Sequence, residues 1–258
     1  MSSADLHKAR NVKDDEFYTC FSDIEKEMEY YKDYFQNKIV YCNCDDPVKS
    51  EFWRYFCLNF TKLGLKKLIS TYYDADGQAY ETEYFGENSS NINICARTKL
   101  LQNGDFRSAE CVDILKQVDI IVTNPPFSLF RTYVSLLMKH QKKFLILGSK
   151  NAVTYKDFFP FLKNNEIRFG INAVHDFRRP DGSVEKLGNV CWYTNFDINI
   201  FKKKFVFRES YSSDKYPRFD NYDAININRI ADIPSDYYDV MGVPITFLDV
   251  YNPEQFEL

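Results

Sequence analysis

The sequence lacks any apolar run long enough to cross a membrane as a helix, so a membrane-spanning protein is not expected. Glycine is scarce, at 9 of 258 residues, and no two glycines are separated by a single residue. The glycine-rich turn that binds dinucleotides is therefore absent, which argues against hydride transfer. The Gly-Lys-Ser/Thr loop that cradles phosphates is absent too, which argues against a nucleoside triphosphatase.

An excess of positive charge is also missing, because the formal net charge is −4. The chain is therefore not a globally basic nucleic-acid binder, and a DNA-binding face would have to gather its basic residues locally. Seven cysteines at irregular spacing, with no secretory signal, predict reduced thiols in the cytoplasm. Cys42 and Cys44 are two residues apart, but no second pair or histidine cluster completes a zinc site, so no metal is expected.

The pattern of apolar residues predicts one large α/β domain with a smaller appended lobe. Short β-branched runs alternate with stretches whose apolar residues recur at helical spacing, which predicts a mostly parallel sheet flanked by helices. The predicted strands span residues 38–42, 67–73, 119–123, 144–147, 190–194 and 204–207, with a hairpin at 78–85 and 92–98. The predicted helices span residues 24–35, 46–63, 109–116, 128–139 and 155–163.

The helix over residues 46–63 has start and stop signals in the sequence. Asp46 is expected to cap it, with Pro47 in the first helical position. Gly64 is expected to end it in the left-handed conformation.

The segment Asp119–Phe127 is the most informative stretch of the chain. Its β-branched residues predict a buried parallel strand, which stops at Pro125 and Pro126 because prolines have no N–H and a fixed φ. Asn124 is then expected at the carboxyl edge of the sheet, where ligands bind in open α/β folds.

This corner suits methyl transfer to an exocyclic amine. The Asn124 side-chain oxygen and the Pro125 carbonyl would accept both N–H bonds, so that the nitrogen lone pair points at the incoming methyl group. Phe127 would stack on a planar base, a contact worth about 1–3 kcal/mol. The alternative is a turn that merely ends a strand. The sequence Asn-Pro-Pro-Phe nevertheless resembles the signature of amino-methyltransferases that use S-adenosylmethionine.

Carboxylates follow the predicted strands at the edge expected to carry Asn124. Asp45 and Asp46 end the first strand, Asp74 ends the second, and Asp105 precedes the Asn124 strand. S-adenosylmethionine offers a ribose diol, an adenine amine and an amino group, each of which needs an acceptor, and Phe106 could stack on the adenine. Taken singly, each Asp is more typical of a helix cap or a solvated charge than of a cofactor site. Their recurrence at three successive strand ends favours the cofactor site.

The chain resembles the EcoRI-type adenine-specific DNA methyltransferases over most of its length. The similar segments are residues 15–19, 43–47 with Ser50 and Phe52, 63–69, 104–108, 123–131, 191–195 and 241–248. The resemblance implies a Rossmann-like fold, S-adenosylmethionine as donor, and transfer to N6 of an adenine flipped out of duplex DNA. It also implies that Tyr18 and Thr19 touch the methionine end of the cofactor and that Asp45 and Asp46 replace the usual glycine-rich loop.

The DNA contacts are less specific in the sequence. Arg131, Lys150, Arg178 and Arg179 are the candidate phosphate contacts, although a solvated face is an equally good interpretation of the lysine run at 202–204. Residues 1–210 are expected to form the methyltransferase domain. Residues 211–258 would form a C-terminal extension and possible DNA-recognition segment.

Two alternatives remain open at this point. The same motif serves amino-methyltransferases that act on RNA adenine or on a protein glutamine, and a non-catalytic nucleic-acid-binding module could retain the fold. The leading interpretation is a site-specific DNA methyltransferase in a restriction–modification, orphan or phage-encoded setting. A cognate endonuclease, if there is one, would be a separate protein, and the sequence predicts no oligomeric state.

Overall fold

The chain forms two compact units, Met1–Phe196 and Asp197–Leu258. The computed structural model describes residues 18–86, 96–174, 176–178, 183–186, 188–198 and 204–258. The predicted domain boundary at residue 210 thus lies inside the second unit, and the units divide between Phe196 and Asp197.

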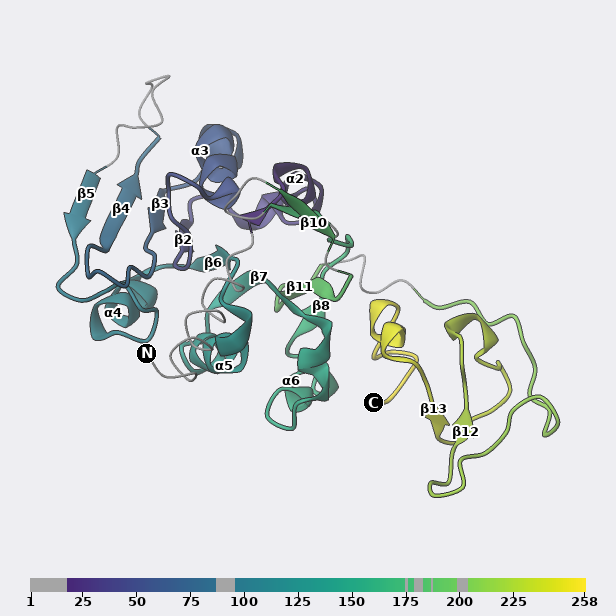
Figure 1. The fold of residues 1–258 in the computed structure, drawn as a ribbon. Helices are drawn as coiled ribbons and strands as arrows, with labels where there is room; N and C mark the ends of the chain where they lie inside the picture. The colour runs from purple at the N-terminus through teal and green to yellow at the C-terminus, as the bar shows by residue number, and fades with distance from the viewer. Residues whose placement is uncertain (1–17, 87–95, 175, 179–182, 187, 199–203) are drawn as a thin grey trace, which may run out of the picture. The chain divides into compact units, whose positions relative to one another are not determined.

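The first unit is built on an eight-stranded sheet (Figure 1). Its order is β5-β4-β3-β2-β6-β7-β11-β8, in which β3, β2, β6 and β7 are parallel and the outer strands are antiparallel. The strands are β2 (Ile39–Cys42), β3 (Lys67–Ser70), β4 (Tyr80–Tyr84), β5 (Ala96–Lys99), β6 (Ile120–Thr123), β7 (Lys143–Ser149), β8 (Arg168–Phe169) and β11 (Val190–Thr194). All four residues of β6 are buried, as its unbroken apolar run predicts.

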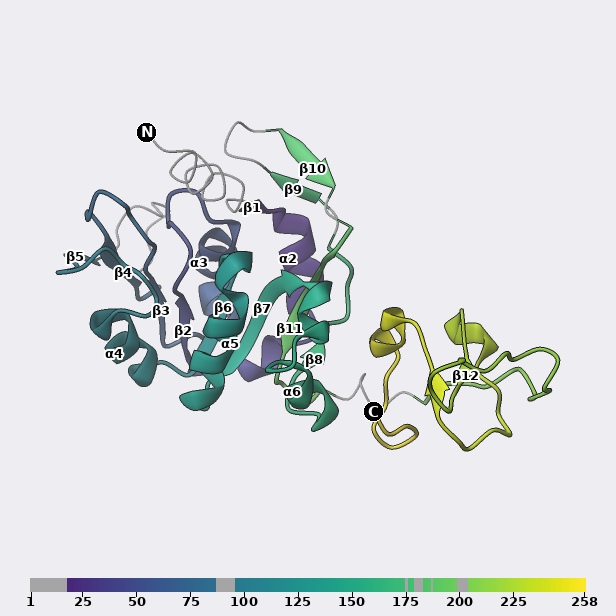
Figure 2. The same cartoon turned by 60° about the horizontal axis from the view of Figure 1, so that its bottom comes forward.

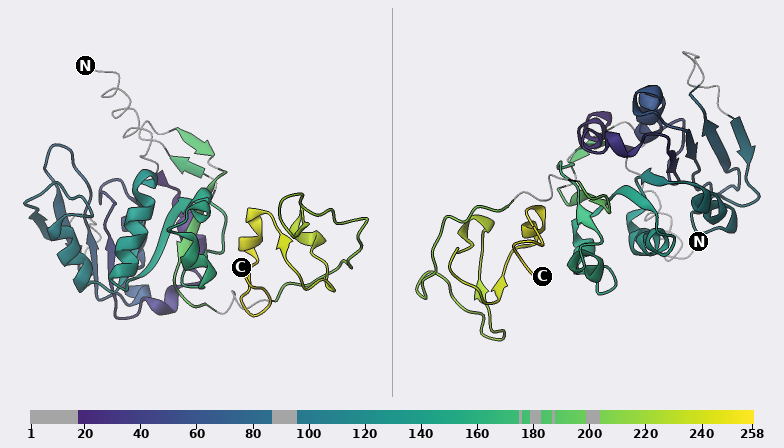
Figure 3. Two further views of the ribbon diagram at one scale, coloured as in Figure 1. Left: turned by 90° about the horizontal axis from the view of Figure 1, so that it is seen from below. Right: turned by 180° about the vertical axis from the view of Figure 1, so that it is seen from behind.

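Helices cover both faces of this sheet (Figures 1 and 2). On one face lie α2 (Phe21–Met28) and α3 (Glu51–Leu63). On the other lie α4 (Ala109–Gln117), α5 (Phe130–Lys139) and α6 (Phe159–Lys163), which stand in front of the sheet in the left view of Figure 3. Short 3-10 turns are η1 (Lys32–Tyr34), η2 (Phe127–Leu129) and η3 (Lys150–Thr154). The predicted α/β, Rossmann-like fold class is confirmed.

The start of α3 differs from the prediction. The helix begins at Glu51 rather than near Asp46, because Ser50 Oγ accepts hydrogen bonds from the backbone N–H groups of Phe52 (3.1 Å) and Trp53 (3.2 Å). The expectation that Asp46 caps this helix is therefore wrong. The predicted end is confirmed, since Gly64 has φ 63° and its N–H caps the last turn.

Four other predicted elements are shorter or absent. The predicted helix at 24–35 ends at Met28 and gives way to η1, and the one at 155–163 begins only at Phe159. The predicted helix at 128–139 begins at Phe130, after the 3-10 turn η2. Residues 204–207 do not form a strand, because the rings of Phe205 and Phe207 pack against Phe256 instead.

A smaller sheet covers the entry of the chain into α2. It consists of β1 (Tyr18–Thr19), β9 (Asp176–Arg178) and β10 (Val184–Lys186), all antiparallel to their neighbours. Figure 2 shows these strands lying together beside α2.

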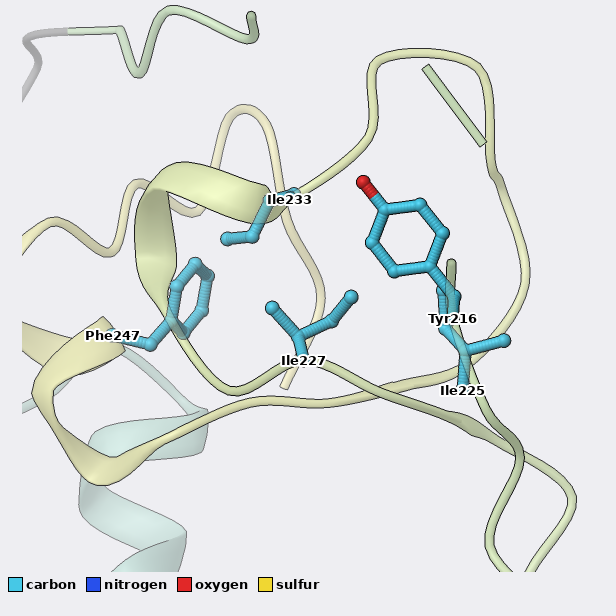
Figure 4. Close-up of a cluster of buried hydrophobic side chains, with 5 residues drawn as sticks. All are labelled: Tyr216, Ile225, Ile227, Ile233 and Phe247. Atoms are coloured by element: carbon cyan, nitrogen blue, oxygen red, sulfur yellow. The ribbon is translucent and has the colours of Figure 1, made fainter. Parts of the chain in front are cut away.

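The second unit has its own small core (Figure 4). Its elements are β12 (Ile225–Asn226), η5 (Ile230–Asp232), β13 (Met241–Gly242) and η6 (Ile245–Asp249), with β12 and β13 parallel. The buried side chains are Tyr216, Ile225, Ile227, Ile233 and Phe247. Tyr216 is the polar member of this core, and its hydroxyl donates to the Asp232 carbonyl at 2.9 Å.

None of the helices in the described part of the chain is long and apolar enough to span a lipid bilayer.

A buried carboxylate fixes α2 to the segment that follows β8. Glu27 is fully buried, and its carboxylate accepts hydrogen bonds from the backbone N–H of Ile171 (2.9 Å) and Asn172 (2.7 Å), the Asn172 amide (3.0 Å) and the Tyr31 hydroxyl (3.1 Å). Burial raises the pKa of Glu27, and the donors oppose that shift.

Replacing Glu27 with alanine should destabilise the first unit by about 2–4 kcal/mol, because several buried donors lose the carboxylate that accepts from them. Denaturant unfolding would measure the loss. Glu25→Ala changes an exposed carboxylate on the same helix and should cost less than about 0.5 kcal/mol. Equal effects of the two substitutions would contradict a structural role for Glu27.

Candidate active site

A cavity of about 560 Å³ opens at the carboxyl edge of the parallel strands. Its wall is formed by β1, the segments that follow β2, β3 and β6, the start of α3, and the turn before α4. The residues that line it are Thr19, Asn43, Cys44, Asp45, Asp46, Lys49, Ser50, Glu51, Phe52, Tyr72, Tyr73, Asp74, Ala75, Gly104, Asp105, Phe106, Arg107, Asn124, Pro126, Ser128 and Leu129. The structure therefore brings the predicted strand-end carboxylates and Asn124 together at one site.

The segments that carry Asp74 and Asp105 are tied to each other. The Asp74 N–H donates to the Asn103 carbonyl at 2.9 Å, which places the end of β3 beside the turn before α4. Gly104 has φ 74°, and a Cβ at this position would lie 2.0 Å from the Tyr72 carbonyl oxygen. This close approach is open only to glycine.

The partly exposed carboxylates of Asp46, Asp74 and Asp105 already have partners in the protein. Both Asp105 oxygens accept from the Arg107 guanidinium, at 2.9 and 2.5 Å, and this contact lowers the pKa of Asp105. Asp46 accepts from the Val48 N–H at 3.0 Å and lies 3.8 Å from the Lys49 ammonium. Asp74 accepts from the Asp76 N–H at 2.8 Å. All three are only partly buried and keep free acceptor capacity, because a carboxylate has about four acceptor positions.

Asp45 differs from these three because its carboxylate is turned into the protein. One oxygen accepts from Ser50 Oγ at 2.7 Å, the other accepts from Thr123 Oγ1, and the Asn124 backbone N–H also donates to it. Burial raises the pKa of Asp45 to about 6, while these donors oppose the shift. Asp45 therefore fixes the corner that carries Asn124, and its carboxylate is not left free for a ligand.

The Asn124–Phe127 corner is only partly exposed to the cavity. Asn124 and Pro126 line it, whereas Pro125 is buried and Phe127 is half-buried at the start of η2 without lining it. The Thr123 hydroxyl, which donates to Asp45, also accepts from the Cys44 N–H at 3.2 Å. The corner is thus attached to the end of β2 by both Asp45 and Cys44.

Two buried polar atoms of residues that line the cavity have no hydrogen-bond partner within the described residues. They are Thr19 Oγ1 and Asn43 Nδ2, and both residues are buried, with 3% and 1% exposed surface. Thr19 is a predicted site residue, and Asn43 is not. Tyr18 lies in β1.

Several lining residues were missed by the sequence interpretation, chiefly Asn43, Tyr72 and Tyr73. Tyr72 and Tyr73 were assigned to a strand that actually ends at Ser70. The signal available in the sequence was their position directly before Asp74, just as Asn43 stands before Asp45.

Phe106 is present at the cavity but is 4% exposed. Its ring meets Tyr133 edge-on at 5.0 Å, and the Arg107 guanidinium lies 5.5 Å from its centroid. Both contacts fix the ring in place.

Two of the predicted DNA contacts, Arg131 and Lys150, do not line the cavity. Arg131, in the first turn of α5, is 3.6 Å from Asp157 and 4.7 Å from the Tyr155 ring centroid. Lys150 follows β7 directly, with its ammonium 5.7 Å from the Phe169 ring. Both residues follow carboxyl ends of parallel strands. Arg178 belongs to β9, and Arg179 lies outside the described residues.

Within the residues that the structure describes, no group of three or more His, Cys, Asp or Glu side chains could hold a metal ion.

Comparison with known proteins relates the chain to a family of methyltransferases. The profile of the family described as adenine-specific methyltransferase EcoRI matches residues 5–258. The chain is 44% identical to the Type II methyltransferase M.EcoRI of Escherichia coli, over 98% of this chain and 87% of that protein. It is 39% identical to M.MgeORF184P of Mycoplasma genitalium and 38% identical to M.MpnI of Mycoplasma pneumoniae, over 98% of this chain and 84% of each relative. No solved structure matches the chain significantly.

The raised pKa of Asp45 predicts a pH-dependent stability that Asp45→Asn should lack. Protonated Asp45 contributes stability that is complete below about pH 4 and is lost as the pH rises through about 6. The wild type should therefore lose about 3 kcal/mol relative to Asp45→Asn between those pH values. Denaturant unfolding across this range would measure the difference.

Asp113→Asn, which changes an exposed carboxylate on α4, is the matched control. This variant keeps Asp45, so its stability should change with pH as that of the wild type does. If the difference in unfolding free energy between the wild type and Asp45→Asn stayed constant over this pH range, burial would not be what raises the pKa of Asp45.

Proposed function

The chain belongs to the EcoRI family of adenine-specific methyltransferases, and we propose that the cavity at the carboxyl edge of its sheet is the active site. As a member of that family it is a DNA methyltransferase that transfers a methyl group from S-adenosylmethionine to adenine. The observation that carries the site assignment is that Asn124 lines the same cavity as Asp46, Asp74 and Asp105.

The cavity residues fit S-adenosylmethionine, which when bound supplies a methyl group activated on a sulfonium. The volume of about 560 Å³ lies within the usual range for ligand pockets. Asp74 and Asp105 would accept hydrogen bonds from the ribose hydroxyls and the adenine amine. Thr19 and Asn43 bring buried polar atoms with no partner among the described residues, which a bound polar ligand would satisfy.

Asn124 and Pro125 would position the target amine. An aromatic amine is a poor nucleophile, because its lone pair is delocalised into the ring. The Asn124 side-chain oxygen and the Pro125 carbonyl would accept its two N–H bonds and hold the nitrogen closer to tetrahedral. Pro125 and Pro126 stiffen this corner, and Asp45 anchors it through Thr123 and the Asn124 N–H. Such preorganisation lowers the barrier without a strong base.

An adenine within a stacked duplex cannot present N6 to such a corner, so we infer that the target base is flipped out. Phe127 stands at the start of η2, next to Pro126, and would stack on the extruded ring. Stacking of this kind contributes about 1–3 kcal/mol per base.

For the duplex itself, we propose Arg131 and Lys150 as phosphate contacts, together with Arg178 and Arg179. Arg131 and Lys150 follow the ends of β6 and β7, the edge of the sheet at which the cavity opens. The C-terminal unit would take part in recognising the target sequence. The relatives carry Type II names, which supports a cognate endonuclease that acts as a separate protein.

Asn124→Ala should reduce methyl transfer to duplex DNA by at least about 100-fold, since it removes one acceptor of the target amine. Binding of S-adenosylhomocysteine should stay within about 3-fold of wild type. Tritiated-methyl incorporation and calorimetry would measure the two effects. Asn164→Ala, at an exposed position outside the cavity, should change neither. Unchanged turnover in Asn124→Ala would remove Asn124 from the mechanism.

Asp74→Ala should instead weaken S-adenosylhomocysteine binding by about 10- to 100-fold, because a hydroxyl or amine of the ligand loses its charged acceptor. Asp76→Ala is the matched control, since Asp76 is exposed, lies two residues away and does not line the cavity. Calorimetry on both variants decides the question. The same affinity in Asp74→Ala and Asp76→Ala would show that the end of β3 does not hold the cofactor.

A further inference from the structure

Asn43 is a buried polar residue of the cavity whose side chain is only half satisfied by the protein. It follows β2 directly, and its Oδ1 accepts a hydrogen bond from the hydroxyl of Tyr133 on α5. Its Nδ2 is buried and has no hydrogen-bond partner within the described residues. Buried donors in native proteins nearly always have an acceptor, so this one indicates a ligand atom.

Tyr133 determines which end of the Asn43 amide is left without a partner. The Tyr133 hydroxyl is fully buried, and Asn43 Oδ1 is its acceptor. Burial raises the pKa of Tyr133 well above its ordinary value, so the hydroxyl keeps its proton and must donate it. Turning the amide over would leave that proton without an acceptor. The Asn43 side chain therefore presents an N–H donor, and not a carbonyl, to the remaining space.

The chemistry of the cavity indicates which ligand group this donor serves. The carboxylates of Asp46, Asp74 and Asp105 suit ligand groups that donate hydrogen bonds, such as hydroxyls and amines. The one anionic group of the cofactor, the carboxylate of its amino-acid tail, needs hydrogen-bond donors instead. The Asn43 amide is a neutral donor in a buried position, and the Thr19 hydroxyl is a second buried neutral donor.

We propose that Asn43 Nδ2 donates a hydrogen bond to the tail carboxylate of the cofactor and that Tyr133 is the positioning residue that orients the Asn43 amide. The inference rests on the proposed function, which supplies the cofactor. It adds Asn43, at the end of β2, and Tyr133, on α5, as a pair of residues that recognises the tail carboxylate of the cofactor. Phe106 packs edge-on against Tyr133 and holds that ring in place.

Asn43→Asp tests the donor. The substitution is nearly isosteric and keeps an oxygen for Tyr133, but it replaces the free N–H₂ with an oxygen that carries negative charge. Calorimetry should compare S-adenosylhomocysteine, which has the tail, with 5′-methylthioadenosine, which lacks it. We expect the Kd to rise about 30-fold for the first ligand and to change less than about 3-fold for the second. Equal weakening of both ligands, or of neither, would overturn the assignment.

Tyr133→Phe tests the positioning role and covers the case in which Asn43→Asp does not fold. It keeps the ring that packs on Phe106 and removes only the hydroxyl. The Kd for S-adenosylhomocysteine should rise about 3- to 10-fold, with 5′-methylthioadenosine unaffected. Tyr155→Phe, at an exposed position outside the cavity, is the control and should change neither Kd.

Ligand binding by the wild-type protein distinguishes a failure of the active-site assignment from a failure of the roles given to Asn43 and Tyr133. A wild-type protein that binds neither ligand would refute the active-site assignment itself. A wild-type protein that binds both, with no tail-dependent loss in either variant, would refute only the roles of Asn43 and Tyr133. Thermal unfolding of each variant in the absence of ligand shows whether a loss of affinity reflects a loss of fold.

Discussion

The buried carboxylate of Asp45 is the contact on which the proposed active site depends. It accepts the Ser50 hydroxyl at the start of α3, the Thr123 hydroxyl at the end of β6 and the Asn124 N–H. The Asp45 backbone also donates to the Thr71 carbonyl and accepts from the Ser70 hydroxyl, so β3 joins the same network. A carboxylate in this position loses its hydration, and only a full set of donors offsets that cost. Three strand ends and one helix are thereby held in a single arrangement.

This arrangement explains how a chain with few glycines forms a nucleotide-sized cavity. Parallel strands bring their carboxyl ends to one edge, so the segments after β2, β3 and β6 meet without long loops. Two prolines end β6 abruptly, and Gly104 lets the turn before α4 approach the Tyr72 carbonyl. Rigidity matters here because an amine held in place by neutral acceptors gains reactivity from orientation alone. The buried carboxylate of Asp45 holds the corner that carries Asn124, whereas the carboxylate of Asp46, the next residue, is partly exposed at the cavity.

The sequence predicted β6, the proline corner and the carboxylates at the strand ends, because a buried apolar run and the residues that end it are local signals. It could not distinguish Asp45 from Asp46. Their difference arises from Thr123, a contact 78 residues away in the chain. The same limit applies to Asn43, whose importance depends on Tyr133 in α5, and to Ser50, which displaced the expected cap at Asp46. Residues 204–207 have strand-like composition, yet their aromatic rings pack into the second unit instead of pairing in a sheet.

The distribution of charge constrains how such a protein holds DNA. In residues 197–258 acidic side chains outnumber basic ones by eleven to seven, and Lys215, Arg218 and Arg229 are each paired with a neighbouring carboxylate. A unit of this kind is not suited to bind phosphates through long-range attraction, which dominates non-specific DNA affinity. We therefore infer that the two units contact different parts of the DNA. Phosphate contacts would come from the first unit, near the ends of β6 and β7, whereas the second unit would contribute contacts to base edges, which depend on hydrogen-bond geometry more than on net charge.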